Sequence, residues 1–273
     1  MVLESLLNAA AVLRKPWLML LYGFGVANVG IIIGSWVFRD HAALVLVFLT
    51  SLALVPLFIQ AMLDQEMLGL TLPSETAALK QHGLAVLGFV LCFVGMSVAF
   101  GMWYIFKPAF FSVQTQTIAA ISNSVTARAV TPGLFTVILI NNLKVLLFCV
   151  FFAFVYGAGG IFILTWNASV IGAAIGNFVE RSAVAAGGAF LAYAAAGGWS
   201  MVRYFTHGIP EVAAYWIGAL AGGMLSAAFI RKHFSKDAMD KVMLDVSDLI
   251  IAAIVILVIA SGIETFVTPL LVT

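Results

Sequence analysis

Two titratable side chains lie four residues apart in the stretch YFTHGIPEVAAYWIG, His207 and Glu211, and a third, Glu264, lies in the last apolar run. Imidazole and carboxyl groups can relay protons or hold a cation, and both are ordinary zinc ligands. Two ligands with a distant third make a weak metal signature. The sequence therefore favours proton or cation chemistry over a metalloenzyme, with these three residues as the only weak metal candidates.

Further polar side chains interrupt apolar runs, and each is costly inside a bilayer unless it finds a partner. An asparagine in a membrane helix commonly bonds to a neighbouring helix. Lys144 either snorkels to the membrane surface or serves as the counter-ion of a glutamate. The simplest joint solution is one shared polar cluster, which we predict to contain Asn141, Asn142, Lys144, Asn167, His207, Glu211 and Glu264.

The segment HGIPE also has a structural interpretation. Pro210 suits the first turn of a helix, Glu211 would then lie near the positive end of that helix, and Gly208 allows a sharp entry. We therefore predict a helix beginning at about residue 210, with His207 turned back towards Glu211. Glu264 lies deep in its apolar run, so we expect it to be protonated, paired or beside a wet cavity.

The elements that position these residues follow from composition. Hydrophobic residues make up 63% of the chain and charged residues 9%. The mean hydropathy is +1.13. Several apolar runs reach the roughly 20 residues that cross a hydrocarbon core as a helix, the form that satisfies its own backbone in lipid. We predict an all-α, polytopic transmembrane helical bundle in the cell membrane, folded as a single domain over residues 1–273.

We predict seven spans, with six or eight as alternatives, at about 17–38, 43–63, 83–106, 134–163, 184–204, 210–230 and 248–270. Residues 17–106 thus hold three N-terminal spans and residues 134–273 a C-terminal core with the polar cluster. The intervening segment 107–133 is too polar to face lipid, and we expect it to be an interfacial or re-entrant helix.

Basic residues favour the cytoplasmic side of a membrane. With the N-terminus inside, cytoplasmic segments collect Arg14, Lys15, Lys80, Arg181, Arg231, Lys232, Lys236 and Lys241. The outside collects Arg39, Lys107, Arg128 and Arg203. We therefore predict a cytoplasmic N-terminus. The basic loop 231–246 is a candidate contact for anionic lipid or a protein partner, although a solvated membrane flank is the simpler interpretation.

Charge, cysteines and small residues indicate which ligands and partners the protein can have. A net charge of +1 without a basic face excludes nucleic acid as a partner, and no motif predicts a cofactor. Cys92 and Cys149 lie in apolar runs and should pack as small apolar side chains. Small residues at four-residue spacing predict tight helix crossings, within one chain or in a homo-oligomer. These pairs are Gly30 with Gly34, Gly172 with Gly176, and Gly218 with Gly222.

Several segments together resemble the stage II sporulation protein M family of integral membrane proteins, in the form typical of archaea. These segments are VLESLLNAAAVLRKPWLMLLYGFG, the NN pair at 141–142, NASVIGAAIG, HGIPEVAAYWIGALAGG and IASGIETFVTP. The resemblance implies a membrane protein, and names neither a substrate nor a molecular activity. Its matching positions are Asn141, Asn142, Asn167, Gly172, His207, Gly208, Glu211 and Glu264.

Two functions follow as hypotheses. In the first, the protein is a non-enzymatic membrane scaffold or envelope-organising factor, in which the polar cluster holds helices together. In the second, it is a proton- or cation-coupled transporter or channel that uses His207, Glu211 and Glu264. The scaffold is favoured because no predicted span carries a run of polar, pore-lining residues.

Overall fold

A computed structural model describes residues 15–71, 75–126, 132–230 and 236–271. Within these ranges the chain forms eight α-helices and no strand, which confirms the predicted all-α bundle. The helices are α3 (Pro16–Val37), α4 (Ala42–Thr71), α5 (Glu75–Phe106), α6 (Ser112–Thr126), α7 (Pro132–Tyr156), α8 (Gly160–Ala185), α9 (Phe190–Ile230) and α10 (Lys236–Gly262). After α10 the chain continues as a π turn, Ile263–Val267, and a 3₁₀ turn, Thr268–Leu271.

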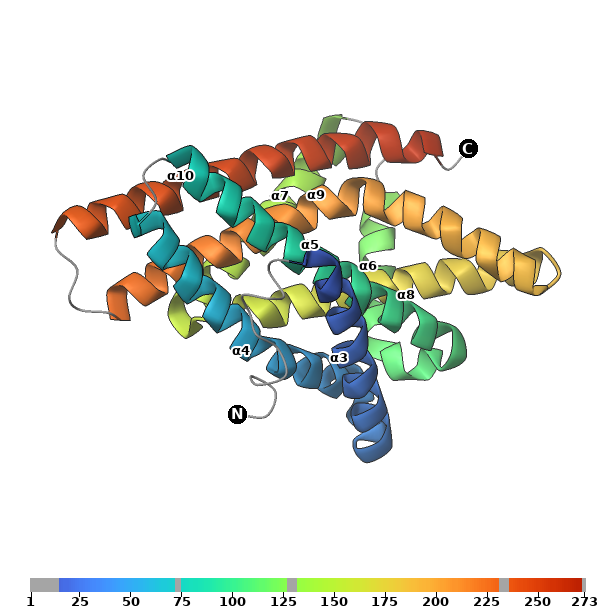
Figure 1. Cartoon of the computed structure of the whole chain (residues 1–273). Helices are drawn as coiled ribbons and strands as arrows, with labels where there is room; N and C mark the ends of the chain where they lie inside the picture. Colours follow the sequence, from blue (N-terminus) through green and yellow to red (C-terminus); the bar gives the residue numbers. More distant parts are fainter. Residues whose placement is uncertain (1–14, 72–74, 127–131, 231–235, 272–273) are drawn as a thin grey trace.

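Seven of these helices are long and apolar enough to cross a membrane, all except α6. The chain is therefore a multi-pass membrane protein in a lipid bilayer environment, as predicted. Figure 1 shows α9 and α10 running side by side and antiparallel, with α8 and α9 joined at the end of the molecule farthest from the start of α10. The side of the membrane on which the N-terminus lies stays a prediction.

Two predicted boundaries are wrong, although the count of seven agrees. Residues 184–204 and 210–230 are not separate spans, because α9 runs unbroken through Pro210. The fourth span ends at Tyr156 instead of residue 163, and α8 crosses where the sequence predicted no span. Polar residues such as Asn167 and Glu180 lower the hydropathy of α8, yet half of its apolar window is buried inside the protein.

The predicted helix start at Pro210 is wrong for a physical reason. A proline inside a helix costs one hydrogen bond and crowds the preceding turn, but its φ is compatible with the helix. In a membrane bundle, neighbouring helices and side chains can compensate for the loss. Gly208 is also helical and has no positive φ, so no sharp entry exists there.

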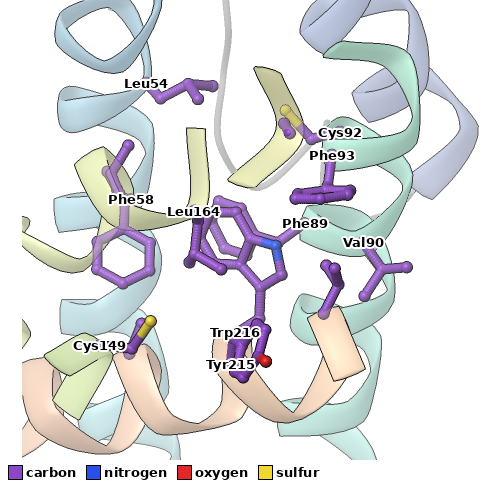
Figure 2. Packing of buried hydrophobic residues seen from close by; sticks show 14 of the residues in the cluster. Leu54, Phe58, Phe89, Val90, Cys92, Phe93, Cys149, Leu164, Tyr215 and Trp216 are labelled. Carbon is purple, nitrogen blue, oxygen red and sulfur yellow. The ribbon is translucent and has the colours of Figure 1, made fainter. Parts of the chain in front are cut away.

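The core lies where α4, α5 and α9 meet, around Trp216 (Figure 2). The Trp216 ring stacks on Phe89 with ring centroids 4.5 Å apart and an interplanar angle of 20°. Phe58 closes the group, 5.4 Å from Phe89 and 5.7 Å from Trp216 between centroids. Cys92 and Cys149 are fully buried free thiols, which agrees with their predicted role as small packing groups.

The small-residue pairs pack inside the chain. Gly30 and Gly34 face α4, Gly172 and Gly176 face α5, and Gly218 and Gly222 face α7. Self-association through these faces would have to displace the protein's own helices. The closest crossing joins α3 and α5, where a Cβ on Gly95 would collide with the carbonyl oxygen of Leu20.

The predicted interfacial segment contains a 3₁₀ turn at Pro108–Phe111 followed by α6, and residues 127–131 lie outside the described ranges. Gln114 on α6 is buried, and its amide donates to the carbonyl of Ala43 at 2.9 Å and to the Ser169 hydroxyl at 3.2 Å. These bonds attach α6 to α4 and α8. Its placement at the membrane interface stays a prediction.

The loop predicted to contact lipid or a partner, 231–246, is described only from Lys236 onwards. There it already forms the first turns of α10, so this helix begins twelve residues before the predicted span at 248.

Candidate functional site

A side-chain hydrogen bond joins α7 to α9. The Asn142 amide nitrogen donates to Oε1 of Glu211 across 2.6 Å. Asn142 is buried, while Glu211 is partly buried. Gly218 and Gly222, two and three turns further along α9, let α7 approach closely, since a Cβ on either would collide with Leu146 or Val150. The crossing therefore brings the amide and the carboxyl group within hydrogen-bonding distance.

Glu264 joins this pair from the end of α10, because its carboxyl group is in hydrogen-bonding contact with that of Glu211. An ionised carboxylate is only an acceptor, so two carboxyl groups hydrogen-bond only when one of them carries a proton. Asn142, Glu211 and Glu264 thus form a polar centre that links α7, α9 and the π turn after α10.

Both acids lie at irregularities of their helices. Glu211 follows Pro210, whose missing N–H leaves the carbonyl of Thr206 without its usual donor from residue 210. Glu264 lies in the π turn at Ile263–Val267, a short element that is frequent at functional sites. Both irregularities therefore lie beside the polar centre.

His207 lies one turn before Glu211 and bonds to the 3₁₀ turn that follows α10 and Glu264. Its Nδ1 is 3.1 Å from the hydroxyl oxygen of Thr268, which is also 3.3 Å from the carbonyl oxygen of Ile263. The Thr268 hydroxyl has one proton, so it donates either to the His207 ring nitrogen or to the Ile263 carbonyl. When the ring nitrogen carries a proton, it donates to the Thr268 oxygen, and the hydroxyl can donate to Ile263 at the same time. His207 therefore ties α9 to the turn that follows Glu264 and is adjacent to the polar centre.

Sequence reasoning missed three neighbours of these residues. Arg203 and Tyr215 continue the four-residue spacing of His207 and Glu211, so all four share one broad face of α9. The Arg203 guanidinium carbon lies 5.3 Å from the ring centroid of Phe178. The i, i+4 spacing could have revealed Arg203 and Tyr215, but nothing in the sequence points to Thr268.

The other predicted members of the cluster lie elsewhere. Asn167 donates to the carbonyl of Ile163 in its own helix at 3.0 Å. Asn141 and Lys144 are exposed on α7. Two residues turn a helix by about 200°, so Lys144 points away from Asn142 and Glu211. Of the roles considered for Lys144, that of counter-ion to Glu211 does not fit this geometry.

The metal interpretation gains no support from the arrangement. Within the ranges that the structure describes, no three His, Cys, Asp or Glu residues are grouped so that they could hold a metal ion. His207 bonds to Thr268 rather than to either acid. The centre is therefore a set of hydrogen-bonded acids and an amide.

The polar centre lies close to the C-terminal end of α10 and near the middle of α7 and α9. From the helical rise, Asn142 is about 15 Å from the start of α7 and Glu264 about 10 Å from the end of the 3₁₀ turn. Glu211 is about 29 Å from the end of α9 at Ile230. Between Glu211 and Ile230, α9 carries only apolar residues, glycine and serine from Trp216 to Ala228. The polar stripe of α9 therefore ends at Tyr215.

Comparison with known proteins gives one match. The family model for stage II sporulation protein M matches residues 29–269, which is most of the chain and includes every residue of the polar centre. No curated protein and no solved structure matches the chain. The chain therefore belongs to the stage II sporulation protein M family.

Proposed function

We propose that this protein is a non-enzymatic membrane scaffold, in which the polar centre holds α7, α9 and α10 in one arrangement and the connecting segments recruit partners. The observation that carries the proposal is the bond from Asn142 to Glu211, completed by the contact with Glu264. Polar groups of three helices satisfy one another in an apolar bundle, where each would otherwise be costly.

The surroundings of the centre also support a structural role. Tyr215, the last polar residue on this face of α9, is 4% exposed and is followed by the packed group of Trp216, Phe89 and Phe58. An ion would need to pass this aromatic group to cross the membrane along α9. A polar stripe that ends at buried Tyr215 suits a packing element better than a conduction path.

Transport is the second candidate, favoured by one specific observation. Glu211 and Glu264 place two acids in contact, and His207 lies one turn before Glu211 on α9. A proton- or cation-coupled transporter or channel would use these three residues as exchange sites, with the aromatic group opening during its cycle.

A comparison of two substitutions at Glu264 separates the candidates. Glu264→Gln keeps the shape and supplies an N–H donor to Glu211, whereas Glu264→Leu removes the bond. A scaffold should show no proton or monovalent-cation flux in proteoliposomes above empty vesicles. Its unfolding temperature in detergent should be nearly unchanged by Glu264→Gln and lowered by Glu264→Leu. Flux in the unaltered protein that Glu264→Gln abolishes at unchanged stability would establish transport instead.

A further inference from the structure

One exposed stripe of α7 has the spacing of a helix-packing seam. Its members are separated alternately by three and four residues, the spacing with which helices pack along one another. All are exposed in the structure. They are Asn141, Lys144, Phe148, Phe151 and Val155.

Lys144 gives this stripe its unusual character. It is the central residue of α7, so about 18 Å of helix separates it from either end. Leu146, half a turn further along α7, packs on Gly218, so Lys144 lies at the level where α7 crosses α9. A lysine has only a four-carbon stem and cannot bring its ammonium group from there to the membrane surface.

Lys144 is exposed on α7, and within the described ranges no ion pair joins it to a carboxylate. The exposed face of α10 is different in composition. Between residues 251 and 259 its exposed residues are all apolar, namely Ile251, Ile254, Val255, Val258 and Ile259. The α10 face suits contact with acyl chains, whereas a charged group at mid-bilayer on α7 requires an anionic partner at the same depth.

We propose that the α7 stripe binds a transmembrane helix of a different protein, and that this helix places an Asp or Glu carboxylate opposite Lys144. The apolar members of the stripe, Phe148, Phe151 and Val155, supply the packing surface. Asn141, one turn before Lys144, supplies an amide that sets the register. This interface goes beyond the scaffold proposal for the polar centre and does not depend on it.

The alternatives fit the charge less well. Two copies of this chain share one orientation in the membrane, so a two-fold pairing through α7 would be parallel and would oppose one Lys144 to the other. Like charges facing each other destabilise such a pair. Lipid phosphates lie at the membrane surface, about half a bilayer away. A carboxylate on a partner helix meets both requirements.

Photo-crosslinking in membranes of the cell that encodes the protein tests this interface. The full chain carries p-benzoylphenylalanine in place of Phe148 on the stripe, or in place of Val258 on α10 as the control. The expected result is a protein adduct from position 148 and none from 258. Mass spectrometry should identify a membrane protein with an Asp or Glu inside a transmembrane helix. Lys144→Glu should reduce that adduct at least tenfold, and the reciprocal change of the partner's acid to Lys should restore it.

Several results would overturn the proposal. They are an adduct with a second copy, an adduct within the chain itself, no protein adduct, or a partner without an intramembrane acid. The proposal would also be overturned if Lys144→Glu left the yield of the adduct unchanged. The purified protein provides a test that needs no partner, because removing an uncompensated charge by Lys144→Met should raise the unfolding temperature in detergent. A lowered temperature would mean that Lys144 makes a contact within its own chain, against the proposal.

Discussion

The amide of Asn142 and the carboxyl group of Glu211 meet across 69 residues of sequence, 2.6 Å apart, at the crossing of α7 and α9. The neighbouring residue, Asn141, has the same side chain and is exposed. Of these two adjacent asparagines, Asn142 therefore bonds α7 to α9, whereas Asn141 does not.

Replacing Asn142 by leucine should destabilise the protein by about 1–3 kcal/mol, because an oxygen of Glu211 loses its donor in an apolar environment. Asn141→Leu is the matched control and should leave the unfolding temperature unchanged or slightly raised. Thermal unfolding of both variants in the same detergent measures the difference. Equal effects of the two substitutions would mean that the bond to Glu211 contributes nothing to stability.

The crossing of α3 and α5 should tolerate no methyl group at Gly95. An added Cβ would collide with the carbonyl oxygen of Leu20, a backbone atom that moves only with its helix. We expect Gly95→Ala to cost about 1–3 kcal/mol, as overpacking does. Gly25→Ala, on the exposed side of α3, meets nothing within 4 Å and should stabilise by up to about 1 kcal/mol through helix propensity. Detergent unfolding curves would contradict this if the two variants behaved alike.

Trp216 should be the most sensitive aromatic residue of the core. Trp216→Ala leaves a cavity beside Phe58 and Phe89 and should cost about 3–5 kcal/mol. Trp216→Phe should cost far less, because the buried indole N–H has no hydrogen-bond partner among the described residues. Trp36→Ala, at a position that is 75% exposed, serves as the control and should have little effect. A loss as large for Trp216→Phe as for Trp216→Ala would reveal a role for the N–H.

The orientation prediction can be measured with single cysteines, since Cys92 and Cys149 are fully buried and should not react in the folded protein. Lys107 and Lys241 are both exposed. Lys107 directly follows the end of α5, whereas Lys241 lies near the start of α10. Both helices start on the predicted cytoplasmic side, so the two lysines lie at opposite ends of the bundle. With the N-terminus inside, a membrane-impermeant maleimide should label Lys107→Cys in intact cells, and Lys241→Cys only after permeabilisation. The reverse labelling pattern would place the N-terminus outside.

Much of the fold could be predicted from composition and apolar run length. Lipid provides no hydrogen-bond partner for the backbone, so a long apolar run in a membrane protein must be helical wherever it packs. This argument is local, and it correctly predicts seven spans and an all-α chain. It fails at α8, where polar residues are compensated by the protein interior, and at Pro210, where a strong local break signal is overridden by tertiary packing.

In the candidate site, too, the residues could be predicted from the sequence but their contacts could not. The residue types of Asn142, His207, Glu211 and Glu264 mark them from the sequence alone, because an ionisable or amide group in an apolar run is costly without a partner. Their partners depend on the rotation of each helix about its own axis, which is set by close crossings such as Gly218 against Leu146. That rotation turns Asn142 towards Glu211 and leaves Lys144 facing outward, a distinction that no local pattern contains. The sequence by itself determined a helical membrane protein with unusual polar residues, and only the tertiary structure decided which of them meet.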